Sequence, residues 1–172
     1  LYSFFEQEGH PEIDLIVQTR MMSENERQAF LERFQNENEK TTVGLLVLGG
    51  VFSEGIDLVG DRLIGAIIIS AGLPQVNFER DQIKAYYDNE DADSRKGFHY
   101  AYTYPGINRT LQAAGRVIRT ENDRGFILYI DSRFRQTPYR TIINELYPDK
   151  IEIISPSQLR MQLRQFWKEQ KP

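Results

Sequence analysis

The sequence predicts an α/β domain built on a mainly parallel sheet with helices on both of its faces. Three apolar runs, at residues 43–48, 65–70 and 125–130, show little alternation, which is typical of strands covered on both faces. Helical stretches separate these runs, and strands that alternate with helices indicate a parallel sheet. A length of 172 residues is enough for a real core, so we expect a single domain over residues 1–172.

Local signals predict the remaining elements. Ser23 and Glu26 match a capping box, which predicts a helix that runs to about Lys40. Residues 88–97 are polar and charged, and we expect them to form an exposed loop. Short strands are predicted at 14–18 and 151–154, and helices at 1–9, 77–90, 106–119, 138–146 and 156–169.

The composition is that of an ordinary globular protein, and it excludes several kinds of site. The chain has no cysteine, which rules out disulfides, thiolate zinc sites and cysteine-ligated iron–sulfur clusters within it. Its two histidines, His10 and His99, are too isolated to suggest a metal site. No apolar run approaches the roughly 20 residues that span a bilayer, so we expect no membrane partner. The chain opens at Leu1 within a predicted helix, and we expect it to be a piece of a longer protein.

The charge is unevenly distributed along the chain. A net charge of −4 and an isoelectric point near 5.3 argue against nucleic-acid binding by the whole surface. Residues 1–40 carry nine acids and four bases, whereas residues 109–140 carry seven arginines and three acids, a local charge of +4. A basic zone on an acidic body is compatible with a focused anion site.

Within this basic zone, residues 112–119 (QAAGRVIR) offer an anion-binding face. At 3.6 residues per turn, Gln112, Arg116 and Arg119 fall at positions i, i+4 and i+7 and share one face of the predicted helix. Two aligned guanidiniums suit a nucleotide phosphate, because each can bond phosphate oxygens bidentately. The plainer alternative is a surface helix whose arginines are solvated.

A glycine-rich loop follows the strand predicted at 43–48. Ligands of open parallel sheets bind beyond the carboxyl ends of the strands, and this loop, residues 49–57, reads GGVFSEGID. Its glycines allow close backbone approach, and Ser53 offers a hydroxyl to a phosphate. Glu54 and Asp57 offer carboxylates to ribose hydroxyls or to an arginine. The alternative is a simple turn with capping carboxylates.

A phosphate loop of the pattern G-x-x-x-x-G-K-[ST] is missing from the sequence. Residues 60–65 have its glycine spacing, but no lysine follows Gly65. Arginines without a phosphate loop suggest half of a composite nucleotide pocket, which another domain completes. A third hypothesis is a stand-alone α/β enzyme for a small phosphorylated metabolite. Such an enzyme would need its own phosphate loop, and the absence of one argues against this hypothesis.

Residues 49–57 and 112–119 together resemble motifs V and VI of superfamily 2 helicases. Their sequences are most similar to those of the XPD/DinG group. The intervening residues 63–74 and the trailing residues 123–134 also resemble that group, so the resemblance covers most of the chain, roughly 14 to 150. It implies a RecA-like, P-loop-NTPase-type domain that lacks its own Walker A loop. It also implies the second motor domain of an ATP-dependent DNA helicase that is bacterial, DinG-like, cytoplasmic, nucleoid-associated and active in DNA repair.

The resemblance further implies roles for individual residues. In such enzymes ATP with Mg²⁺ binds mainly on a first RecA-like domain of the same polypeptide, and the second domain supplies arginine fingers. Arg116 and Arg119 would face the γ-phosphate, with Gln112 beside them. The implied nucleotide-binding positions are Glu54, Gly55, Asp57, Gln112, Arg116 and Arg119. The implied contacts to the backbone of single-stranded DNA are Gly50, Ser53 and Gly72.

The insertion and the last helix carry apolar and aromatic side chains that allow more than one interpretation. The insertion at 76–104, between the two motifs, is rich in aromatics that could stack on bases, although several of them have core spacing. The apolar stripe of the last helix is interpreted as core rather than as a partner site; it consists of Leu159, Leu163 and Phe166.

The competing hypothesis is a catalytically inactive, helicase-like module that binds DNA or protein. The presence of Gln112, Arg116, Arg119 and Asp57 argues against it.

Overall fold

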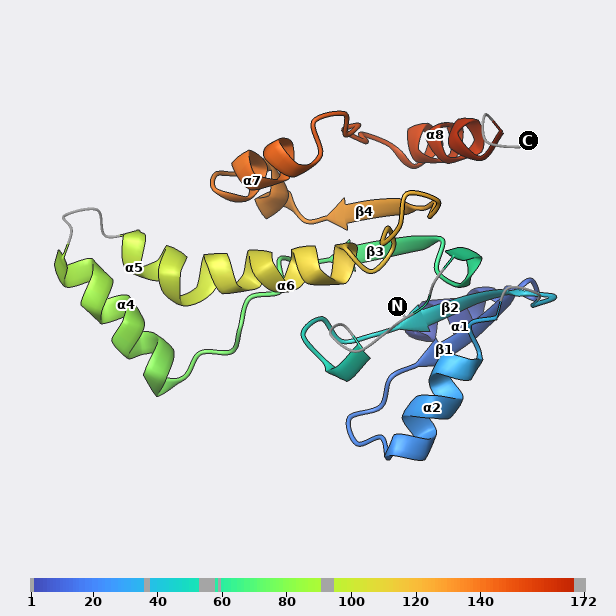
Figure 1. Cartoon of the computed structure of the whole chain (residues 1–172), viewed down its shortest axis with the longest axis horizontal. Helices are drawn as coiled ribbons and strands as arrows, with labels where there is room; N and C mark the ends of the chain where they lie inside the picture. Colours follow the sequence, from blue (N-terminus) through green and yellow to red (C-terminus); the bar gives the residue numbers. More distant parts are fainter. Residues whose placement is uncertain (1, 36–37, 53–57, 59, 91–94, 169–172) are drawn as a thin grey trace. The chain divides into compact units, whose positions relative to one another are not determined.

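The computed structural model divides the chain into two compact units, residues 1–134 and 135–172. It describes all residues except 1, 36–37, 53–57, 59, 91–94 and 169–172. Figure 1 labels the elements. The first unit contains α1 (Tyr2–Glu8), β1 (Ile13–Val17), α2 (Glu24–Glu32), β2 (Thr41–Leu45), η1 (Gly60–Arg62), β3 (Gly65–Ile69), α4 (Phe78–Glu90), α5 (Lys96–Phe98), η2 (His99–Thr103), α6 (Tyr104–Ala114) and β4 (Phe126–Ile130). The short helix η3 (Ser132–Arg135) leads into the second unit, which contains α7 (Tyr139–Leu146) and α8 (Pro156–Lys168).

The predicted α/β class and the parallel pairing of the strands are confirmed. Among the described residues, β1 pairs with β2 and β3 pairs with β4, both in parallel, with Ile13 opposite Thr41 and Gly65 opposite Phe126. All four strands lie within about three residues of their predicted positions. The strand predicted at 151–154 is wrong, because the segment bonds the next helix instead: Ile154 N donates to Gln158 Oε1 (2.8 Å).

The expectation that the apolar strands are covered on both faces is wrong for β3. Ile67 and Ile69 are 57% and 49% exposed, whereas Ile68 between them is 6% exposed. This alternation is the pattern of a strand with one buried face and one open face. The continuous apolar run therefore predicted the strand correctly but overstated its burial.

Helix α2 places an aromatic core against β2. Its predicted capping box is present, with Ser23 N donating to Glu26 Oε2 (2.7 Å) and Glu26 N to Ser23 Oγ (3.3 Å). The rings of Phe30 and Phe52 stack with centroids 4.6 Å apart. A Cβ on Gly44 would lie 2.9 Å from the Phe34 ring, so the glycine lets the helix approach the strand.

Helix α2 ends at Glu32 rather than near Lys40 as predicted. The Asn38 side chain donates to the Arg33 carbonyl (2.6 Å) and to Thr42 Oγ1 (2.9 Å), which gives the end of the helix a partner and turns the chain toward β2.

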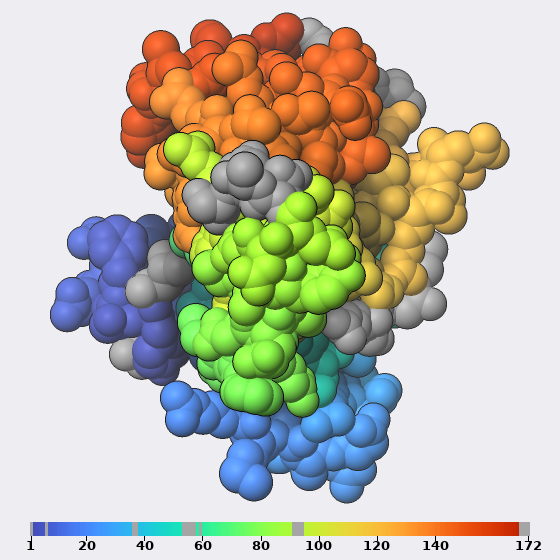
Figure 2. All heavy atoms as spheres, turned by 90° about the vertical axis from the view of Figure 1, so that its left-hand side faces the viewer, coloured from blue at the N-terminus to red at the C-terminus, as the bar shows by residue number. Residues whose placement is uncertain are grey.

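The helices between the two motifs form an arm in which α4 packs on the rod built from α5, η2 and α6. Tyr102 OH donates to Asp81 Oδ1 (2.8 Å), and Arg80 Nη1 donates to the Ala101 carbonyl (2.6 Å). The rings of Tyr87 and Tyr100 stack with centroids 4.2 Å apart, so part of the aromatic content of the insertion holds α4 to the rod. Figure 2 shows the green atoms of α4 forming an outer face of this arm.

The exposed loop predicted at 88–97 is wrong at both of its ends. Helix α4 continues to Glu90, and Lys96–Phe98 is helical. Gly97 is buried, its N–H donates to Asp88 Oδ1 (3.1 Å), and the same carboxylate binds Lys84 Nζ (2.6 Å). The Asp88 carboxylate therefore connects α4 to α5 on either side of the predicted loop.

Candidate nucleotide- and nucleic-acid-binding site

Helix α6 ends at Ala114, before the two arginines of the predicted face. Gly115 N donates to the Leu111 carbonyl (2.8 Å), but Arg116 N donates to the Ala113 carbonyl (3.3 Å), which is the tighter i to i−3 bond of a 3₁₀ turn. The prediction of one helical face shared by Gln112, Arg116 and Arg119 is therefore wrong. Gln112 lies exposed on the last turn of α6, Arg116 is half-buried in the turn beyond it, and Arg119 follows exposed.

The turn that carries Arg119 is fixed by Asp123. The Asp123 carboxylate accepts from the backbone N–H groups of Arg119 and Thr120, both at 2.8 Å. These bonds, the one from Arg119 first, lower the pKa of the Asp123 carboxyl. Val117 is buried, and a Cβ on Gly125 would lie 2.4 Å from Val117 Cγ1, so the chain after Asp123 folds tightly back on the turn.

We expect the stability of this turn to depend on pH. A carboxyl whose pKa is lowered by folding stabilises the native state above its unfolded pKa, and the contribution is lost as the pH falls through the folded pKa. Asp123→Asn should therefore be less stable than the wild type near neutral pH, and the difference should shrink as the pH falls below 4. Urea unfolding at a series of pH values measures it.

The matched control for this measurement is Glu121→Gln, which removes a carboxylate two residues away. A stability difference between wild type and Asp123→Asn that stays constant across the acid range would contradict the role given to the Asp123 carboxylate.

Two loops at the carboxyl ends of β2 and β3 meet on α6. A Cβ on Gly72 (φ +59°) would lie 2.7 Å from Leu48 Cδ2 and 3.3 Å from Thr110 Oγ1. A Cβ on Gly106 would lie 2.8 Å from the Ala71 carbonyl. Glycines at these points allow both loops to approach the helix closely.

The predicted site residues of the first loop fall into two groups. Gly50 is described: its N–H donates to the Val47 carbonyl (2.9 Å), and the Gln18 side chain lies beside it. The side-chain oxygen Oε1 of Gln18 also accepts from Val47 N (2.9 Å). The predicted positions Ser53, Glu54, Gly55 and Asp57 lie outside the described residues.

Helix α6 thus connects the described candidate residues of both kinds. Its first half packs on the loop with Gly72, and Arg109 places its side chain over Gly49, where a Cβ would lie 3.2 Å from Arg109 Cδ. Its last turn carries Gln112 and leads to Arg116. Gly72 therefore lies against the first half of α6, whereas Gln112 lies on its last turn and Arg116 just beyond it.

Sequence reasoning missed a polar cluster at the ends of β3 and β4. Arg133 Nη2 donates to Asp131 Oδ2 (2.6 Å) and to Ser70 Oγ (2.9 Å), and Arg133 Nε donates to Asp131 Oδ1 (2.9 Å). The Arg133 guanidinium lowers the pKa of the Asp131 carboxyl. Ser70 has φ +80°, unusual for a residue with a side chain. The Asp-x-Arg spacing directly after a strand was the available signal.

Arg109 was also missed as a site neighbour. Its place over Gly49 depends on the packing of α6 against the first loop, which no local pattern indicates. Within the described residues, no group of three or more His, Cys, Asp or Glu side chains could hold a metal ion. No helix in the described part of the chain has the length and apolar character needed to span a membrane.

The comparison with protein families decides the identity of the domain. The family model described as the helicase C-terminal domain matches residues 1–150. The chain belongs to this family. The match extends from α1 to residue 150, just beyond the end of α7 at Leu146. It includes every described residue of the candidate site.

Similar proteins place this helicase C-terminal domain in the XPD/DinG group. It is 31% identical over 146 residues to a probable ATP-dependent helicase of Methanocaldococcus jannaschii, which covers 78% of the chain and 21% of the relative. It is 28% identical over 140 residues to the ATP-dependent DNA helicase DinG of Photobacterium profundum (80% of the chain, 19% of the relative). It is 26% identical over 125 residues to the XPD helicase subunit of the general transcription and DNA repair factor of Dictyostelium discoideum (73% and 16%). The chain thus spans about a fifth of the length of these relatives.

Proposed function

We propose that this chain is the second motor domain of an ATP-dependent DNA helicase. In this proposal Arg116 and Arg119 act on a nucleotide held by a first RecA-like domain of the same polypeptide. Gly50, Ser53 and Gly72 contact the backbone of single-stranded DNA. Family membership and the names of the similar proteins support the assignment. A bacterial, nucleoid-associated role in DNA repair is part of the same proposal.

The observation that carries the proposal is the braced turn after α6. Two backbone N–H groups of this turn bond the Asp123 carboxylate at 2.8 Å, so the main chain of Arg119 has a defined position before any nucleotide binds. Preorganised cations stabilise developing charge without reorganisation during the reaction. A transferring γ-phosphoryl group spreads negative charge over its oxygens, and guanidiniums supplied by a rigid turn match that charge.

The described residues fit one half of a nucleotide site. Arg116 and Arg119 complement phosphate oxygens, and the exposed Gln112 amide on the last turn of α6 can add a hydrogen bond. The described residues offer no carboxylate cluster for Mg²⁺, and in this proposal the first domain binds most of the ATP with its metal ion. Hydrolysis of bound ATP supplies the free energy for movement along DNA. Glu54, Gly55 and Asp57 complete the proposed nucleotide contacts.

The DNA side of the proposal rests on the loops around Gly50 and Gly72. Both glycines are half-buried and lie on loops at the carboxyl ends of parallel strands. Backbone N–H groups in such loops bind phosphates without reading bases, so sequence preference should be weak. Because α6 touches the Gly72 loop and leads into the arginine turn, a shift at either end moves a rigid helix of 11 residues.

The test uses the polypeptide that joins this chain to a first motor domain. We expect its ATP hydrolysis to rise when single-stranded DNA is added, and we expect it to displace the strand of a partial duplex only with ATP. The competing hypothesis of a catalytically inactive binding module predicts DNA binding without hydrolysis. Hydrolysis that is absent with and without DNA, in a folded protein that binds ATP, would contradict the proposed function.

A further inference from the structure

Helix α8 carries a row of cations beside a row of apolar side chains. Arg160, Arg164 and Lys168 follow one another at a spacing of four residues, so they share one face, and all three are exposed. The described helix, PSQLRMQLRQFWK, contains no acidic residue. In a chain with a net charge of −4, this face is a local concentration of positive charge.

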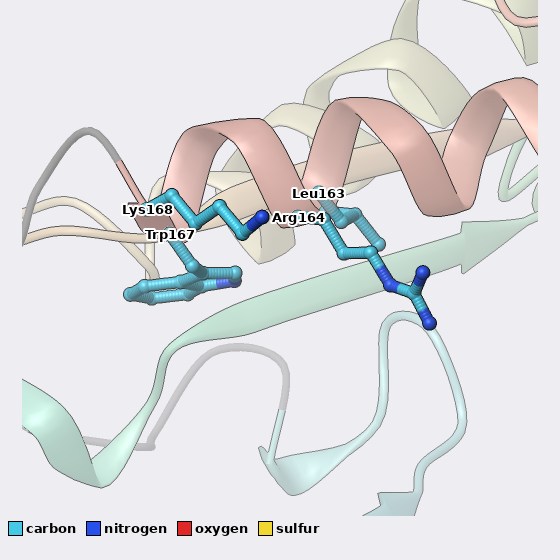
Figure 3. A pocket seen from close by; sticks show the side chains of 4 residues that line it. All are labelled: Leu163, Arg164, Trp167 and Lys168. Atoms are coloured by element: carbon cyan, nitrogen blue, oxygen red, sulfur yellow. The ribbon is translucent and has the colours of Figure 1, made fainter.

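An aromatic ring lies next to this row. Leu163, Arg164, Trp167 and Lys168 line an open, shallow surface depression along α8. Figure 3 shows the Trp167 ring and the Arg164 guanidinium projecting from the same side of the helix. Trp167 is half-buried, and its ring lies edge-to-face with that of Phe166 (centroids 5.0 Å apart), so part of the indole stays accessible.

We propose that α8 is an additional binding site for single-stranded nucleic acid, outside the motor motifs. The three cations bind consecutive phosphates, and Trp167 stacks on a base. Charge complementarity selects a polyanion as the occupant, and an indole beside a row of cations selects one that also has aromatic bases. The site rests on the proposed function in that it takes the same substrate. It lies beyond residue 150, where the match to the helicase C-terminal domain ends.

The proposed site lies beside the apolar stripe of α8 that the sequence interpretation assigns to the core. The stripe of Leu159, Leu163 and Phe166 is half-buried rather than buried, and no residue of α8 is fully buried. At 100° per residue, Trp167 lies between Leu163 and the cationic row, so the apolar and basic rows are adjacent. Such a helix presents a mixed surface that suits a base and its phosphate together.

The test exploits the fact that Trp167 is the only tryptophan of the chain. Oligothymidylate is titrated into the 172-residue chain, and two signals are recorded: tryptophan fluorescence, and the anisotropy of a dye on the oligonucleotide. We expect saturable quenching of Trp167. Each lost phosphate contact lowers the salt slope of single-strand binding by about 0.7, so Arg160→Gln/Arg164→Gln/Lys168→Gln should lower it by about 2 and abolish the quenching.

Matched variants separate this site from general charge. Arg140→Gln/Lys150→Gln removes two exposed cations of the same unit away from the row and should leave the quenching intact. Trp167→Leu should weaken binding by about 5-fold to 150-fold, as the loss of one base stack does, and Trp167→Phe should retain most of the affinity.

Three outcomes overturn the α8 site. The first is DNA binding by anisotropy with an unchanged Trp167 signal, which leaves the proposed motor function standing. The second is quenching that survives in the triple variant. The third is quenching by anionic phospholipid vesicles but not by oligothymidylate. Conversely, Trp167 quenching by oligothymidylate in a parent protein that never hydrolyses ATP would support the α8 site and contradict the motor function.

Discussion

Replacing Arg119 by alanine is expected to reduce ATP turnover by the joined motor domains by about 10³- to 10⁵-fold, while DNA binding changes little. The expected size follows from arginine fingers in related phosphoryl transfer, where a single guanidinium stabilises charge that develops only in the transition state. Arg119 is exposed, and its backbone N–H, which alanine retains, donates to Asp123 Oδ2, so the substitution should keep this bond of the turn. Steady-state hydrolysis at saturating single-stranded DNA measures the effect.

The matched control for this variant is Arg124→Ala. Arg124 is an exposed arginine five residues further along the same basic zone, and its replacement by alanine removes the same charge. We expect its turnover to stay near that of the wild type. Normal turnover by Arg119→Ala, or an equal loss in both variants, would contradict a specific role for Arg119 at the γ-phosphate.

Replacing Gly72 by alanine is expected to lower the free energy of unfolding of the chain by about 2–4 kcal/mol. Two costs combine at this position. A residue with a Cβ at φ +59° adopts the left-handed region, which costs about 1–2 kcal/mol. The new Cβ would also lie 2.7 Å from Leu48 Cδ2 and 3.3 Å from the Gly106 carbonyl, which forces the loop away from α6.

A second glycine separates these two costs. Gly60 has φ +65°, but among the described residues a Cβ there would have no neighbour within 4 Å, so Gly60→Ala should lose only the backbone part, about 1–2 kcal/mol. Chemical denaturation of both variants, followed by circular dichroism, compares them. Equal losses would contradict the close packing of the Gly72 loop on α6.

The strands and the first helix caps were predictable because their causes are local. Apolar runs marked β2, β3 and β4, and the Ser23–Glu26 pair alone specified the start of α2. Gly115 follows directly after the last residue of α6, but it has a right-handed backbone (φ −65°), so it is not the left-handed glycine that typically ends a helix, and the arginine spacing suggested a longer helix. Asp123, three residues after Thr120, is a residue type common in turns, and it binds the Thr120 N–H in the turn after α6.

The assembly of the site was less predictable, because it depends on contacts between distant segments. Nothing near Gly72 in the sequence indicates that Gly106 and Thr110 lie against it. The stack of Tyr87 on Tyr100 likewise depends on how α4 folds back on the rod. Motif resemblance named the candidate residues Gln112, Arg116 and Arg119, but the turn geometry that presents the two arginines required the structure.

The bridge from Arg133 to Ser70 has a mechanical consequence for the loop that carries Gly72. The loop that carries Gly72 is anchored twice at its start, by Ser70 N on the Ile130 carbonyl (3.2 Å) and by Ser70 Oγ on Arg133 (2.9 Å). Both anchors lead to β4 and to the residues that follow it, not back along β3. A load applied to this loop is therefore shared by β3 and β4, so that, under the proposed function, neither strand alone would bear the pull of a bound DNA strand.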